Sequence, residues 1–147
     1  MKEVIFMKVK KTLIKLGSII LLVVTIGASI FVINYNKNKE ECINIVKQQT
    51  SNINPNINFD QAYSKYLIDT NYTYYKTQEG KQIVSVTGER YFSDKDKIQK
   101  IEIQYLVDSK TGELHFYKAF IDGAKMNEVE ALILKVKAFS TYDSTNI

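Results

Sequence analysis

The chain has 147 residues, 45% of them hydrophobic and 24% charged, which is typical of one globular domain. A single Cys and a single His exclude a disulfide framework and a Cys-rich or His-rich metal site. The net charge of +4 comes from residues 1–34, with five Lys against one Glu, because the other 15 basic and 15 acidic side chains cancel. A neutral remainder lacks the basic face that neutralises phosphates, so we expect no nucleic-acid partner.

An uncharged apolar run from Leu16 to Ile33 predicts a transmembrane helix over residues 16–34. Five Lys precede this run, so the positive-inside rule places the tail 1–15 in the cytoplasm and the C-terminal part outside the cell. The prediction is a single-pass signal anchor in the cell membrane, with the lipid bilayer as its first partner. The alternatives are a cleaved signal peptide and a buried core helix. Met7 offers a second start to the chain.

Residues 35–54 are predicted to form a juxtamembrane helix and a linker. Within 38–50, Cys42, Ile45, Val46 and Gln49 recur at the spacing of one helix face. Residues 51–58 contain the only Pro and four Asn, which predicts a break in regular structure.

The outer domain is predicted over residues 55–139 and starts with a short helix capped by Asn58. The apolar stripe of that helix is expected to face a core, and it consists of Phe59, Ala62, Tyr63, Tyr66 and Leu67. The period then changes from 3.6 to 2, which predicts four strands at 72–78, 82–92, 98–108 and 113–121. Short turns join them, so we expect an antiparallel meander.

Two details of this meander are expected from the alternation of side chains. Gly88 inside its strand predicts a bulge or a close crossing of a helix. On the last strand, one face is predicted to hold Leu114, Phe116 and Phe120, and the other His115, Tyr117 and Ala119.

The final helix is predicted to begin after Asn127, and a polar tail follows at 140–147. Its core-facing stripe is predicted to contain Val129, Leu132, Ile133, Val136 and Phe139. The predicted fold class is therefore α+β: an N-terminal transmembrane helix, then a small domain with a four-stranded antiparallel meander packed against helices.

The order of motifs resembles a small extracytoplasmic domain of membrane-anchored proteins in low-GC Gram-positive bacteria, the Clostridia and Bacilli. That family is often found after a zinc ribbon and a transmembrane helix. The resemblance rests on these segments: INFDQAYSKY (57–66), YTYYKT (72–77), EGK (79–81), IVSVTGE (83–89), IEIQYLVD (101–108), KTGELHFY (110–117) and NEVEALILKV (127–136). The resemblance implies the architecture and the location of this domain, but it implies no activity. The helix-on-sheet plan is also similar to cystatin-like and nuclear-transport-factor-like folds.

No catalytic, cofactor-binding or metal-binding set of residues emerges from the spacing. His115 is a candidate for acid–base chemistry by residue type but has no nucleophile or carboxylate at a recognisable spacing, so we interpret it as a surface residue. Asp94 and Asp96 resemble half of a calcium loop but lack its bidentate Glu. A hydrolase or isomerase centred on His115 is the least favoured function.

Ten Tyr in the chain point to protein contacts, because Tyr buries area while keeping a polar group. The alternative is that Tyr fills the core in a chain without Trp. Tyr72, Tyr74 and Tyr75 are the predicted partner-binding residues, on a strand expected at the sheet edge with one of the last two exposed. The predicted function is non-enzymatic binding of a protein partner or self-association. A small-ligand carrier with a pocket lined by Tyr63, Tyr91 and Tyr105 is the alternative.

Overall fold

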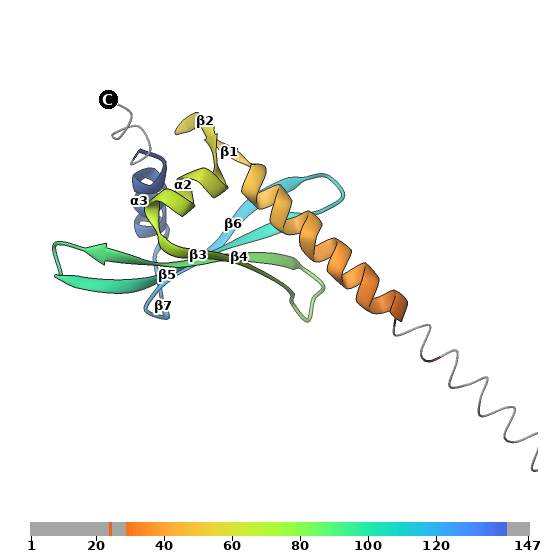
Figure 1. Ribbon diagram of the computed structural model, residues 1–147. Coiled ribbons are helices and arrows are strands. Elements are labelled where there is room, and N and C mark those ends of the chain that lie inside the picture. Colours follow the sequence, from red (N-terminus) through yellow and green to blue (C-terminus); the bar gives the residue numbers. More distant parts are fainter. Residues whose placement is uncertain (1–23, 25–28, 141–147) are drawn as a thin grey trace, which may run out of the picture. The chain divides into compact units, whose positions relative to one another are not determined.

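The computed structural model describes residue 24 and residues 29–140 (Figure 1). The chain divides into two compact units, Met1–Lys37 and Asn38–Ile147, and each is described by itself. Of the predicted transmembrane span 16–34, most lies outside the described residues. Within the described part of the chain, no helix is both long and apolar enough to cross a membrane.

The second unit is an α+β domain. Residues 29–48 are helical, and the helix enters this unit at Asn38. The elements that follow are β1 (Thr50–Ser51), β2 (Asn54–Asn58), α2 (Phe59–Tyr66), β3 (Ile68–Lys76), β4 (Gln82–Phe92), β5 (Lys97–Asp108), β6 (Glu113–Ile121), β7 (Ala124–Lys125) and α3 (Glu128–Ser140). One five-stranded sheet has the order β3-β4-β5-β6-β7, and β1 and β2 form a separate pair; all neighbours are antiparallel.

The α+β class and the antiparallel meander are confirmed, with two differences. The sheet has a fifth strand, β7, because Asp122 (φ 50°) and Gly123 (φ 80°) form a tight turn after β6. Two successive positive φ angles suit the twist of a hairpin, so the chain returns instead of ending the sheet. Residues 51–58, predicted to be a break, belong largely to the β1–β2 pair.

Helix α2 follows its predicted pattern. The Asn58 side chain accepts a hydrogen bond from the Gln61 backbone N–H (2.8 Å), and the Gln61 side chain accepts one from the Asn58 N–H (2.9 Å). This reciprocal cap satisfies two backbone donors at the start of the helix. The predicted stripe is buried throughout, with Phe59, Ala62, Tyr63, Tyr66 and Leu67 each at most 4% exposed.

The core lies between one face of the five-stranded sheet and the helices on that face (Figure 1). Gly88 of β4 allows Leu67, which follows α2, to approach the sheet closely, since a Cβ added at Gly88 would lie 2.8 Å from the Leu67 Cβ. A close approach at this glycine is confirmed, although the neighbour is the segment between α2 and β3, and the β3–β4 pairing is also irregular opposite Gly88, between Ile68 and Asn71. The helix 29–48 also contributes, because Cys42 and Val46 are fully buried in the same core.

Strand β6 departs from strict alternation. Tyr105 pairs with Phe116 but Gln104 pairs with Lys118, so the register shifts by one residue at Tyr117. A bulge of this kind reverses the face of every later side chain. Ala119 is therefore buried in the core, and the predicted face that combined Leu114, Phe116 and Phe120 is wrong.

Candidate interaction surface

Helix α3 carries apolar side chains on two opposite faces. Its buried residues are Ala131, Leu134, Ala138 and Phe139. On the other face four apolar side chains are exposed: Val129 (66%), Leu132 (58%), Ile133 (49%) and Val136 (40%). At about 100° per residue, Ala131, Leu134 and Ala138 point away from the exposed set, whereas Phe139 follows Leu132 by seven residues, projects on the same side as Leu132 and is nevertheless buried. We call the exposed set the outer stripe of α3.

The predicted core-facing stripe of this helix is wrong, because only Phe139 of its five residues is buried. The Phe139 ring lies 5.2 Å from the ring of Phe59 and 6.2 Å from that of Tyr63, centroid to centroid. The small side chains Ala131 and Ala138 lie on the buried face together with Leu134 and let the helix approach closely. Both faces satisfy the helical period, and the structure buries the face that carries Ala131, Leu134 and Ala138.

A cavity of about 240 Å³ lies between α3 and the sheet, next to the outer stripe. Its walls include Tyr63, Tyr105, Phe116, Leu132 and Lys135. A neighbouring hollow of about 350 Å³ shares the last four of these side chains and also reaches Phe59. Two of the three tyrosines predicted for a ligand pocket are therefore present, whereas Tyr91 is exposed and donates a hydrogen bond to Asp96 (2.6 Å).

The polar groups of this cavity are a tyrosine pair, Lys135 and Glu128. The hydroxyls of Tyr63 and Tyr105 lie 2.5 Å apart, and burial raises the pKa of both well above the usual range. Both hydroxyls thus stay protonated at neutral pH. The Lys135 ammonium lies 5.3 Å from the centre of the Phe59 ring, and partial burial lowers its pKa. The cavity can hold an apolar group next to one cation and one carboxylate, but it presents no nucleophile activated by a base.

The predicted partner-binding tyrosines do not share one surface. Strand β3 does lie at the sheet edge, as expected. Tyr74 is 6% exposed and points into the core, whereas Tyr75 is 37% exposed on the opposite face. Tyr72 is half-buried, with the Lys47 ammonium 4.7 Å from its ring centre. Only Tyr75 of the three is exposed enough to meet a partner directly.

The face of the sheet without helices holds a polar cluster. Glu102 accepts hydrogen bonds from the Ser85 hydroxyl (2.8 Å) and the Gln104 amide (2.7 Å). Burial, followed by the nearby Glu102 charge, raises the pKa of Tyr75. This face also carries Tyr75, Ile83 and Leu106 beside the polar cluster, whereas the outer stripe of α3 consists of apolar side chains alone.

His115 and Cys42 lie apart. The His115 side chain is 65% exposed, and its Nε2 atom lies 3.7 Å from the Glu113 carboxylate. Cys42 is fully buried, and burial raises the pKa of its thiol. In the described part of the chain, no three His, Cys, Asp or Glu side chains come close enough to hold a metal ion.

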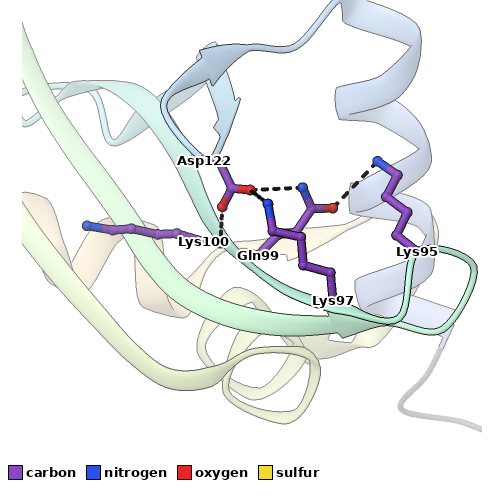
Figure 2. A network of polar contacts seen from close by, with 5 residues as sticks. All are labelled: Lys95, Lys97, Gln99, Lys100 and Asp122. Atoms are coloured by element: carbon purple, nitrogen blue, oxygen red, sulfur yellow. Dashed lines mark hydrogen bonds and ion pairs between the residues drawn. The ribbon is translucent and has the colours of Figure 1, made fainter.

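A polar network around Asp122 holds the turn that leads toward α3 (Figure 2). Its carboxylate accepts hydrogen bonds from the Lys97 ammonium (2.8 Å), the Gln99 amide (3.0 Å) and the Lys100 backbone N–H (2.9 Å). These bonds hold the pKa of Asp122 well below its usual range, with Lys97 making the largest contribution. The network connects the start of β5 to the β6–β7 turn and so helps to position the segment before α3.

Comparison of the chain with family models, curated proteins and solved structures finds no match. The candidate surface therefore rests on the geometry above. The sequence did contain a signal for it, since apolar residues occupy both faces of residues 128–140.

Proposed function

We propose that this protein is a membrane-tethered, non-enzymatic domain that binds a protein partner through the outer stripe of α3. The observation that carries the proposal is the exposure of four contiguous apolar side chains on a helix whose opposite face is already buried. A helix in a two-layer domain needs only one apolar face for its own core. Contiguous exposed apolar surface is typical of interaction sites.

The size of the stripe is consistent with an interface core. Full burial of one aliphatic side chain is worth about 1.5–3 kcal/mol, and these four already have about half of their surface covered. Their combined burial contributes on the order of 4 kcal/mol, part of which association entropy offsets. We therefore expect a modest affinity between free domains and a larger effect where both partners are held at one membrane.

Support for the tether comes from the apolar run in the sequence. Its described part includes Ile30, Phe31, Val32 and Ile33, which are each more than half exposed in a helix. Four consecutive exposed apolar side chains suit contact with lipid on all sides of the helix. We propose a single-pass anchor at the cell membrane, with the N-terminus in the cytoplasm and the domain outside.

The test is site-specific photocross-linking in intact cells that express the full chain. A photoreactive residue at Leu132 should capture a protein, whereas the same residue at the exposed position His115 should not. Capture at Tyr75 with none at Leu132 would move the interface to the edge of β3. Absence of capture at both Leu132 and Tyr75 would refute protein binding.

A small-ligand carrier is a second candidate, favoured by the cavity of about 240 Å³ beside Lys135. Its apolar walls and the Lys135 cation suit a small aromatic carboxylate whose charge lies beside Lys135 and away from Glu128. Arylcarboxylates should then raise the melting temperature of the full chain, and Lys135→Met should abolish that shift while leaving the melting temperature without ligand nearly unchanged. An equal shift in both proteins would exclude a specific role for Lys135.

A further inference from the structure

The charges that border the outer stripe follow a symmetric order. Residues 128–137 read Glu-Val-Glu-Ala-Leu-Ile-Leu-Lys-Val-Lys. Read from Lys137 back to Glu128, the segment has the same order of apolar and charged positions, with a base at each acidic position and an acid at each basic position. Glu128 thus mirrors Lys137, Glu130 mirrors Lys135, and Leu132 mirrors Ile133.

The helix places these charges on both sides of the stripe. At about 100° per residue, Glu128 and Lys135 border one side, two turns apart, and Glu130 and Lys137 border the other. Glu128, Glu130 and Lys137 are exposed, and Lys135 is half-buried with its stem beside the cavity. On each side an acid lies near the start of α3 and a base near its end.

We propose that the partner on this surface is a second copy of the same chain, with the two α3 helices packed antiparallel across a two-fold axis. This inference rests on the proposed function and identifies its partner. Around such an axis Leu132 faces the partner's Ile133, and Val129 faces the partner's Val136. Glu128 then lies near the partner's Lys135, and Glu130 lies near the partner's Lys137.

Charge complementarity selects this orientation. A parallel pair would bring Glu128 toward the partner's Glu130 and Lys135 toward the partner's Lys137, so that like charges meet. The antiparallel pair replaces each repulsion with an attraction, and it also opposes the two helix dipoles. A two-fold interface uses the same patch on both copies, so association stops at the dimer.

The interface is small, because two turns of one helix supply its core on each side. A standard stable interface buries about 800 Å² per partner. We therefore expect reversible dimers whose population depends on confinement to the membrane, where the effective concentration is high.

The test is disulfide cross-linking of the full chain in membranes, with the buried Cys42 unchanged and the wild type as control. Val129→Cys alone should form little dimer, since the two sulfurs are at opposite ends of the pair. A mixture of differently tagged Val129→Cys and Val136→Cys chains should form mixed dimer, in at least tenfold excess over either self-dimer. Efficient self-cross-linking of Val129→Cys would show a parallel pair and overturn the proposal.

Charge reversal gives an independent readout. Chains with Glu128→Lys and Glu130→Lys should lose self-association at least tenfold, and so should chains with Lys135→Glu and Lys137→Glu. The mixture of the two should recover the dimer, provided that circular dichroism shows both variants folded. If either variant fails to fold, the cysteine mixture decides.

Failure of this inference differs from failure of the proposed function. Photocapture of a different protein at Leu132, together with no mixed disulfide dimer, would overturn self-pairing and leave protein binding in place. No capture at either Leu132 or Tyr75 and no mixed disulfide would overturn both.

Discussion

Helices α2 and α3 begin in the same way but use their surfaces differently. Each is capped by an Asn whose side chain accepts a hydrogen bond from the backbone N–H three residues later, and each returns a side-chain bond to that Asn. The outer face of α2 is polar, with Gln61, Ser64 and Lys65 exposed. The outer face of α3 is apolar. Local capping signals therefore determine where a helix begins. The polarity of the face that points away from the core indicates whether the helix has a further surface to pack against.

The attachment of the two helices to the rest of the domain differs as well. Polar contacts that join α2 to the sheet include the Tyr63–Tyr105 hydroxyl pair and the Arg90 guanidinium, which donates to the Tyr66 carbonyl (2.6 Å). Arg90 also lies 3.7 Å from the centre of the Tyr66 ring. The buried face of α3 consists of apolar side chains alone. The rotation of α2 is therefore specified by hydrogen bonds, and that of α3 by shape.

The largest expected effect separates the two faces of α3. Leu134 is 5% exposed, so Leu134→Ala should lower the free energy of unfolding by about 2–5 kcal/mol. Leu132 is 58% exposed, so Leu132→Ala should change it by less than about 0.5 kcal/mol. Denaturant unfolding of the two variants measures both values. Equal losses would show that the outer stripe belongs to the core after all.

The predictable parts of the fold are those in which polar and apolar positions are segregated. The alternation of Ile101, Ile103, Tyr105 and Val107 in β5 leaves one choice of face, and all four are buried. Helix α3 left two choices, because its apolar residues surround the axis. A two-residue strand such as β7 is too short to carry a period, and a bulge such as that at Tyr117 depends on the pairing with β5.

The candidate site was located only in part from the sequence. The edge position of β3 and the exposure of one of Tyr74 and Tyr75 were predictable from strand order and alternation; both are confirmed, and the exposed one is Tyr75. A binding role for Tyr72, Tyr74 and Tyr75 stays a prediction, and the burial of Tyr74 separates it from direct contact. The outer stripe was missed because the same four residues were assigned to the core.

The next effect concerns the polar attachment of α2. Tyr63→Phe leaves the Tyr105 hydroxyl buried without its partner, which should cost about 1–3 kcal/mol of unfolding free energy. Removing both hydroxyls in Tyr63→Phe/Tyr105→Phe leaves no unpaired group, so the double variant should be more stable than either single variant. Additive losses in this double-mutant cycle would mean that the two hydroxyls do not depend on each other.

The caps test whether the two helices do begin alike. Asn58→Ala and Asn127→Ala each remove one acceptor for a backbone N–H and should each cost about 1 kcal/mol. Thermal unfolding monitored by circular dichroism measures both losses. Asn56→Ala, in the exposed part of β2, serves as a control for loss of an Asn side chain outside a cap. A silent Asn127→Ala would mean that α3 is held by its packing alone.

The smallest effect is pH-dependent and concerns the turn before β7. Because the folded pKa of Asp122 lies below the value of about 3.9 in unfolded chains, its ionised form stabilises the folded state. That contribution is fully present above about pH 4 and is lost as the pH falls through the folded pKa.

Asp122→Asn keeps an oxygen acceptor and tolerates the positive φ of this position, but it removes the attraction to Lys97. Its melting temperature should be slightly below that of the wild type at pH 7, and the difference should shrink at pH 3. Asp94→Asn, in the exposed β4–β5 turn, should leave the melting temperature unchanged at pH 7. A difference that grows on acidification would mean that the Asp122 carboxylate destabilises the turn, contrary to its three hydrogen bonds.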